Sequence, residues 1–212
     1  MEVTGSEAII KSLLNEGVDT VFGYPGGAIM PFYDALYHAS KDIHHILVRH
    51  EQAAAHAAEG YARVTGKAGV CIATSGPGAT NLVTGIADAM LDSVPIVCIT
   101  GQVFSDLLGT DAFQETDVIG ITMPVTKWNY QIDKPEEIPE IISKAFYIAE
   151  NGRPGPVLVD ITKDAQVNKF DYKPAKVSVI ENFNPKPKVN EEKIKEAAKL
   201  INEAERPFIL LG

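Results

Sequence analysis

The chain has 212 residues, of which 45% are hydrophobic, and its formal net charge is −9 at pH 7. This hydrophobic content is ordinary for a soluble globular protein with a sizeable core. The negative charge argues against a nucleic-acid or anionic-membrane partner, because either would need a basic face on the protein. It does not argue against one anionic cofactor, since a phosphate needs only a local cluster of hydrogen-bond donors.

The cysteines, the N-terminal segment and the length of the apolar runs indicate where in the cell the protein belongs. Cys71 and Cys98 both lie inside apolar runs, so we expect small buried core residues rather than a disulfide or a metal-binding pair. No signal-peptide pattern precedes Thr4 and no apolar run approaches the length of a membrane span. We therefore expect a cytoplasmic protein without a membrane partner.

The N-terminal part predicts a helix, a strand and a second helix. Residues 4–7 (Thr-Gly-Ser-Glu) form a capping box that opens a helix, and Gly17 ends that helix. Residues 18–23 then predict a short strand, and residues 24–28 (YPGGA) a turn before a helix to His38. Paired glycines let a backbone approach a ligand closely, but they also simply permit a tight turn. The turn alone is weak evidence for a site.

The next stretch, residues 43–63, combines an apolar run with an alanine-rich segment. Residues 43–48 predict a strand emerging from a core, and residues 53–62 have high helix propensity. Glu51 falls at the strand-to-helix turn, where open α/β sheets place their ligand-binding groups. A carboxylate there can also satisfy free backbone N–H groups and complement the helix dipole. On position alone we favour that capping role over catalysis.

The middle of the chain continues the alternation of strands and helices. Residues 67–74 and 94–101 predict buried strands of the kind found in parallel sheets. Between them, residues 75–81 (SGPGATN) open a helix that runs to about Leu91. This segment lacks the third glycine of the G-x-G-x-x-G pattern, so we do not expect a dinucleotide site in it. Residues 102–116 form a polar and aromatic loop that is long enough to indicate a binding role.

The following elements complete an α/β unit. Residues 125–132 predict a strand, residues 135–150 an amphipathic helix, residues 151–156 a tight turn and residues 157–161 a last strand. Strands that alternate with helices predict a parallel sheet of about six strands with helices on both faces.

The composition changes near Val167, where Lys, Pro, Asn and Asp become frequent. Further on, Asn190 is placed to cap a helix over residues 191–204, and residues 208–211 predict the first strand of a second unit. A strand without its sheet indicates a piece of a longer protein. We predict three parts: a domain over residues 1–166, a linker over residues 167–189 and the truncated start of a second α/β domain over residues 190–212.

Five stretches carry a family resemblance: FGYPGGA (22–28), RHEQAAAHAAEGYAR (49–63), TSGPGATNL (74–82), ITGQV with GTDAFQE (99–103 and 109–115), and GRPGPVLVD with its trailing Lys-Asp (152–164). In this order and spacing they resemble the catalytic large subunits of acetolactate (acetohydroxyacid) synthase, which are thiamine-diphosphate enzymes. The resemblance implies that residues 1–166 are a pyrimidine-binding domain and residues 190–212 the start of the family's central domain.

The resemblance gives Glu51 a chemical role. It implies that the carboxylate hydrogen-bonds N1′ of the cofactor's aminopyrimidine and so favours removal of the C2 proton of the thiazolium ring. The implied reaction is decarboxylation of pyruvate and condensation with a second 2-keto acid. The products are 2-acetolactate or 2-aceto-2-hydroxybutyrate, in branched-chain amino acid biosynthesis.

Other site residues are implied by matching positions. Pro25, Gly26 and Gly27 border the cofactor, and the backbone of Gly27 lies against its reactive centre, unless Gly27 is simply a turn glycine. Gln114 lies near the reacting carbonyl, or its amide caps the loop.

The remaining assignments concern the substrate channel and a flavin. Phe113 lines the channel, or it packs against the protein. Lys163 lies at the mouth of the channel, or it is an ordinary exposed lysine. Arg153 contacts FAD, which the family binds without using its redox chemistry, or it pairs with a surface carboxylate.

The implied cofactors are thiamine diphosphate, Mg²⁺ and FAD. No histidine spacing in the sequence resembles a metal site, and the metal–diphosphate motif of the family is absent, so the Mg²⁺ ligands are expected outside this chain. The implied partners are a second catalytic subunit, with the site between the two subunits of a homodimer, and a small regulatory subunit. The chain alone is expected to be inactive.

Two alternatives stay open. One is another thiamine-diphosphate enzyme of 2-keto acids, such as pyruvate oxidase or a decarboxylase. Glyoxylate carboligase is disfavoured, because it is expected to lack a glutamate at the position of Glu51. The other alternative is a non-catalytic binding module that stands alone.

Overall fold

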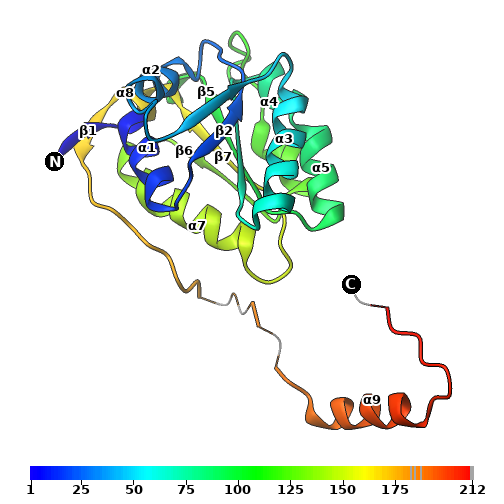
Figure 1. Cartoon of the computed structure of the whole chain (residues 1–212). Helices are drawn as coiled ribbons and strands as arrows, with labels where there is room; N and C mark the ends of the chain where they lie inside the picture. The colour runs from blue at the N-terminus through cyan, green and yellow to red at the C-terminus, as the bar shows by residue number, and fades with distance from the viewer. Residues whose placement is uncertain (182, 184, 187, 211–212) are drawn as a thin grey trace.

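A computed structural model describes residues 1–181, 183, 185–186 and 188–210. Six parallel strands form its central sheet, in the spatial order β3-β2-β4-β5-β7-β6. Figure 1 shows this sheet with helices packed around it. The strands are β2 (Thr20–Gly23), β3 (His44–Leu47), β4 (Gly69–Ala73), β5 (Ile96–Gln102), β6 (Trp128–Ile132) and β7 (Val157–Thr162). The predicted α/β fold with a six-stranded parallel sheet is confirmed.

Helices cover both faces of this sheet. One face carries α1 (Gly5–Asn15), α2 (Met30–His38), α7 (Ile138–Glu150) and α8 (Lys163–Val167). The other face carries α3 (Glu51–Thr65), α4 (Pro77–Asn81), α5 (Val83–Asp92) and α6 (Val118–Thr122). Short 3₁₀ turns complete the described elements: η1 (Ser105–Leu107), η2 (Met123–Val125) and η3 (Pro135–Glu137).

The strands alternate between two apolar cores because successive side chains point to opposite faces of a sheet. In β4, Val70 and Ile72 share one core with residues of α1, α2 and α7, while Cys71 and Ala73 share the other core with residues of α3 and α5. Cys71 pairs in register with Cys98 of β5, and both are buried and free, with their Sγ atoms 3.3 Å apart. The prediction that both cysteines are core residues is confirmed.

Local signals fix several element boundaries. The capping box is present, since Thr4 Oγ1 accepts from Glu7 N and Glu7 Oε2 accepts from Thr4 N. Gly66 ends α3 in the left-handed conformation with φ of 73°. The single helix predicted after Ser75 is divided at Leu82 into α4 and α5.

The strand predicted to emerge from a core does begin beside the buried Ile43, but its later residues are more exposed than their apolar character suggests. The strand lies at the edge of the sheet beside β2, and Ile46 and Leu47 are 39% and 59% exposed. An apolar run marks a strand but does not say where in the sheet the strand lies.

Two short strands were not predicted. β1 (Glu2–Thr4) pairs antiparallel with β8 (Lys169–Asp171), which falls in the predicted linker. Farther along, the backbone N–H of Val177 donates to Ser143 Oγ of α7 at 2.8 Å. The beginning of the linker segment is therefore attached to the domain, and the division into three parts stays a prediction.

The C-terminal helix α9 (Glu191–Glu203) is capped by Asn190, as predicted, and none of its residues is buried. Figure 1 shows α9 drawn clear of the sheet. The strand predicted over residues 208–211 is wrong for residues 208–210, which have no strand partner in the described chain, and Leu211 lies outside the described residues. Among the described residues we find no helix with the length and hydrophobicity that a membrane crossing requires.

Candidate functional site at the carboxyl edge of the sheet

The strand order creates a switch point next to β2. From β2 the chain moves outward to β3, and it then returns to β4 on the opposite side of β2. Open α/β sheets bind ligands at the carboxyl ends of their strands at such a point. The turn after β2 (residues 24–28), the turn after β4 (residues 75–78) and Glu51 after β3 all belong to this edge.

Glu51 is the first residue of α3, and its side chain is mostly buried at 9% exposure. It does not act as the side-chain cap of the helix, because His50 Nδ1 accepts the hydrogen bond from Gln52 N at 3.2 Å. The Glu51 carboxylate instead accepts from Asn81 Nδ2 at 2.9 Å, through Oε2. The side-chain cap of α3 is therefore His50, and the prediction that Glu51 caps the helix is wrong.

The other carboxylate oxygen of Glu51 faces a glycine. A Cβ added to Gly78 would lie 3.3 Å from Glu51 Oε1 and 2.7 Å from Thr74 Cγ2. Among the described residues, Oε1 accepts no hydrogen bond. One carboxylate oxygen is thus held by Asn81, and the other faces the turn of residues 75–78.

Thr74 joins the two turns of the switch point. Its Oγ1 accepts from Ala28 N at 3.2 Å, and a Cβ at Gly26 would lie 2.5 Å from Thr74 Cβ. Glycine is therefore required at Gly26 and Gly78 by the close packing of the two turns on one threonine. Gly27 differs, because a Cβ there would meet no atom of the described chain within 4 Å.

Tyr33 of α2 lies close to the end of β2, near the same turns. Its Oη is buried without a hydrogen-bond partner among the described residues, and a Cβ at Gly23 would lie 2.4 Å from it. Burial raises the pKa of Tyr33, and the nearby Cys71 and Glu51 raise it further. Tyr33 is therefore a neutral phenol at neutral pH.

The loop after β5 brings the predicted Gln114 to this edge. Gln114 has a positive φ of 59° and its backbone packs on the β4 turn, since a Cβ at Gly76 would lie 2.7 Å from Gln114 O. Phe113 beside it is 88% exposed. Lys163 follows β7 at the same edge, where its N–H donates to Val103 O at 3.2 Å. Its Nζ lies 5.8 Å from the centre of the Phe104 ring, a cation–π distance.

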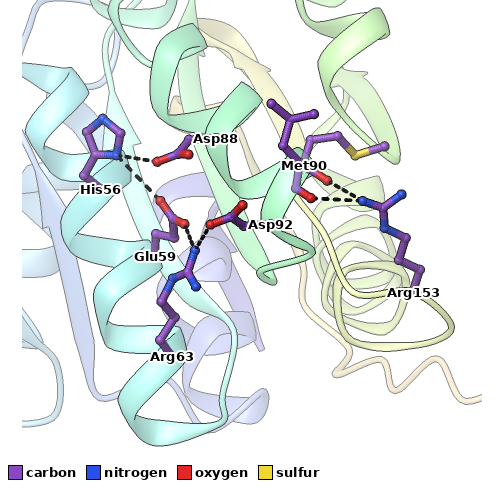
Figure 2. Close-up of polar contacts among 8 residues, drawn as sticks. His56, Glu59, Arg63, Asp88, Met90, Asp92 and Arg153 are labelled. Carbon is purple, nitrogen blue, oxygen red and sulfur yellow. Dashed lines mark hydrogen bonds and ion pairs between the residues drawn. The ribbon is translucent and has the colours of Figure 1, made fainter. Parts of the chain in front are cut away.

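Arg153 lies at the opposite edge of the sheet, because it precedes β7. Its Nε donates to Ser93 Oγ at 2.7 Å. A terminal nitrogen donates to the carbonyls of Met90 and Leu91 at 3.2 and 3.1 Å (Figure 2). Arg153 thereby satisfies carbonyl groups at the C-terminus of α5. The structure does not bring Arg153 together with Glu51, and no carboxylate of the described chain pairs with it.

A second polar cluster lies between α3 and α5, away from the switch point (Figure 2). His56 Nδ1 lies 3.4 Å from Asp88 Oδ2 and 3.6 Å from Glu59 Oε2. These three groups are close enough to ligate a metal ion, which the sequence did not indicate because Asp88 belongs to another helix. Arg63 already pairs with Glu59 at 2.6 Å and also with Asp92. We therefore assign the cluster as an ion-pair network that joins the two helices.

The structure thus places all but one of the predicted site residues after strands at the same edge of the sheet: Pro25, Gly26, Gly27, Glu51, Phe113, Gln114 and Lys163. Arg153 is the exception. Sequence reasoning missed Thr74 and Asn81, although both lie inside the TSGPGATNL stretch. Their contacts join residues far apart in the chain, which a motif does not reveal. The individual roles of the predicted residues stay predictions.

A doubly wound α/β domain with a buried carboxylate and two glycine turns at its switch point defines a cofactor-binding domain. Comparison with known proteins identifies the family. Residues 3–121 match the model described as "Thiamine pyrophosphate enzyme, N-terminal TPP binding domain", and the chain belongs to this family.

Individual relatives confirm the resemblance to acetolactate synthase large subunits. The chain is 59% identical over 212 residues to the "Probable acetolactate synthase large subunit" of Methanocaldococcus jannaschii, covering 98% of the chain and 35% of the relative. It is 57% identical over 211 residues to the "Acetolactate synthase large subunit" of Corynebacterium glutamicum, covering 99% and 33%. It is 52% identical over 211 residues to the "Acetolactate synthase" of Mycobacterium bovis, covering 100% and 34%. The chain thus spans about a third of the length of these relatives.

Proposed function

We propose that this chain is the pyrimidine-binding part of an acetolactate synthase large subunit, in which Glu51 activates thiamine diphosphate. The observation that carries the proposal is the state of Glu51. Its carboxylate is buried at the switch point, is not used as the helix cap, and has one oxygen held by Asn81 while the other faces Gly78.

The residues at this edge fit an aminopyrimidine ring. A carboxylate oxygen that accepts no hydrogen bond within the described chain suits a ring nitrogen that carries a proton, because a hydrogen bond to a charged group is one of the stronger kinds. When bound, thiamine diphosphate supplies an acidic carbon that adds to 2-keto acids. Glu51 would hold the hydrogen bond to the ring, Asn81 would fix the orientation of the carboxylate, and Gly27 would leave room for the cofactor.

The full reaction follows from the same proposal. The whole protein would decarboxylate pyruvate and condense the two-carbon unit with a second 2-keto acid, giving 2-acetolactate or 2-aceto-2-hydroxybutyrate. Phe113, Gln114 and Lys163 would border the substrate, and Arg153 would contact FAD from the opposite edge. The identities of 52–59% to acetolactate synthases favour this reaction over that of a pyruvate oxidase or decarboxylase, and over a non-catalytic module.

Partners and further cofactors belong to the same proposal. A second catalytic subunit would complete the site, Mg²⁺ would be held by residues outside this chain, and a small regulatory subunit would bind the assembled enzyme. We place the enzyme in the cytoplasm.

The proposal is tested by the product formed from pyruvate. A protein of the relatives' length that carries this chain should form 2-acetolactate when thiamine diphosphate, Mg²⁺ and FAD are supplied. The 212-residue chain alone should form none, because it holds the activating carboxylate without the metal–diphosphate site. Release of free acetaldehyde or of an oxidised two-carbon product by the longer protein would contradict the assignment, and turnover by the chain alone would contradict the division of the site.

A further inference from the structure

A buried carboxylate lies inside the sheet close to the carboxyl edge. Asp160 of β7 is fully buried, and burial raises the pKa of its side chain. Three side chains donate to it: Thr100 Oγ1 to Oδ1 at 2.6 Å, and Gln102 Nε2 and Gln131 Nε2 to Oδ2 at 3.0 and 2.9 Å. These donors come from the two neighbouring strands, β5 and β6, so Asp160 is the centre of a polar network across three strands.

Gln102 differs from the other two donors, because its side chain also bonds to a loop. Its Nε2 donates to Thr116 O at 3.0 Å, and its Oε1 accepts from Val103 N at 2.9 Å. Val103 begins the loop that follows β5, and Thr116 ends that loop. One fully buried side chain therefore joins both ends of loop 103–116, while Asp160 holds it from the sheet.

The loop that Gln102 closes packs on the turn of residues 75–78, which faces Glu51. The backbone of Gln114 packs on Gly76, where a Cβ would lie 2.7 Å from Gln114 O and 3.0 Å from its Cα. The same turn carries Gly78, next to Glu51 Oε1. One glycine turn therefore touches the loop on one side and the Glu51 carboxylate on the other.

We propose that Gln102, oriented by Asp160, is a positioning residue that fixes loop 103–116 against the turn of residues 75–78 and so sets the affinity for the 2-keto acid. The proposal rests on the proposed function, since that function places the substrate in front of Glu51. Gln102 itself lies behind the loop, fully buried, and acts through the loop. Its removal would leave Val103 N without a partner and would take from Thr116 O one of its two donors, the other being Val118 N at 2.8 Å.

The chain offers a matched control. Gln102 and Gln131 both donate through Nε2 to the same oxygen of Asp160, but only Gln102 bonds to the loop ends. Methionine approximates the volume of glutamine without its hydrogen bonds, so Gln102→Met and Gln131→Met each remove one donor to Asp160 Oδ2, and only Gln102→Met also removes the bonds to the loop ends. Both variants should be made in the longer enzyme that carries this chain.

Three readouts separate loop positioning from a general loss of stability. In hydrogen exchange, amides of residues 103–116 should exchange about 5- to 100-fold faster in Gln102→Met, the scale of one lost buried hydrogen-bond partner, and at the normal rate in Gln131→Met. The KM for pyruvate should rise by a similar factor in Gln102→Met alone. Exchange of the C2 proton of bound thiamine diphosphate should stay normal in both variants, because Glu51 and Asn81 are unchanged.

A second variant tests the loop without touching the polar network. Gly76 has a positive φ of 57°, and alanine there would press on Gln114 O. Gly76→Ala should raise the KM for pyruvate as Gln102→Met does. Equal effects of Gln102→Met and Gln131→Met on loop exchange and KM would overturn the inference. Absence of 2-acetolactate formation in the unmodified enzyme would instead overturn the proposed function, and the exchange comparison would still decide whether Gln102 holds the loop.

Discussion

Gly26 and Gly27 are neighbours in one turn, yet the structure predicts different effects of alanine at the two positions. A Cβ at Gly26 would lie 2.5 Å from Thr74 Cβ, whereas a Cβ at Gly27 would meet nothing within 4 Å in the described chain. Gly27 also has no positive φ, so its backbone accepts alanine without strain. Gly27→Ala therefore distinguishes a turn glycine from a glycine whose backbone lies against a cofactor.

The two alanine substitutions should change the free energy of unfolding in opposite directions. Alanine at a compatible glycine position raises the free energy of unfolding by about 0.4–1 kcal/mol, which we expect for Gly27→Ala. Overpacking against Thr74 should lower that free energy by about 1–3 kcal/mol in Gly26→Ala. If the cofactor packs against Gly27, the added methyl group should weaken binding by about 1–3 kcal/mol, or roughly 5- to 140-fold in Kd.

The assay combines thermal unfolding with calorimetric titration of thiamine diphosphate, in the longer enzyme with Mg²⁺ present. Gly27→Ala should unfold at or above the normal temperature and bind the cofactor more weakly. Gly26→Ala is the control: its unfolding temperature, measured in the absence of the cofactor, should be lower than normal. Normal cofactor affinity and normal turnover in Gly27→Ala would refute the reasoning and leave Gly27 as a turn glycine.

Two further predictions concern the other edge of the sheet. Arg153→Ala should lower flavin affinity by about 1–3 kcal/mol, the size of a charged hydrogen bond, and spare C2 exchange because Arg153 lies at the edge opposite Glu51. Fluorescence titration with FAD measures this, and unchanged flavin affinity would remove the assignment. Burial lowers the pKa of Lys127 to about 8, below its unfolded value of about 10.4. At this site the unfolded state then binds more protons between these two pH values, so the contribution of Lys127 to stability should rise as pH increases from about 8 to about 10.4. Lys127→Met should abolish that rise in denaturant unfolding, and a rise that persists in the variant would exclude Lys127 as its source.

Long apolar runs made most of the fold predictable. The strands β4 and β5 are buried along their whole length, and such runs bounded by glycine and proline indicate central strands without knowledge of their partners. The capping residues Thr4 and Asn190 also act locally, so both helix starts were predicted correctly.

The remaining features depend on partners far away in the chain. The pairing of Glu2–Thr4 with Lys169–Asp171 joins two three-residue strands, too short to show a period. The edge position of β3 depends on the order of the strands, and the break at Leu82 on how α4 and α5 pack.

The site was predictable only where a signal is local in the sequence. Glu51 stands out because a carboxylate at a strand-to-helix turn can be read from the sequence. Three features depend instead on how the turns fold. His50 caps the helix, Asn81 holds the carboxylate, and Gln102 closes the loop.

The most direct test of the account is the rate of C2 proton exchange in bound thiamine diphosphate, measured by deuterium exchange and NMR in the longer enzyme. Glu51→Gln should slow this exchange by at least ~10²-fold, the usual scale of a positioned acid–base group, with flavin content near normal. Glu59→Gln is the matched control, because Glu59 is a second buried carboxylate on α3 that pairs with Arg63 instead. We expect exchange in Glu59→Gln to stay near the normal rate. Exchange at the wild-type rate in Glu51→Gln would contradict the account.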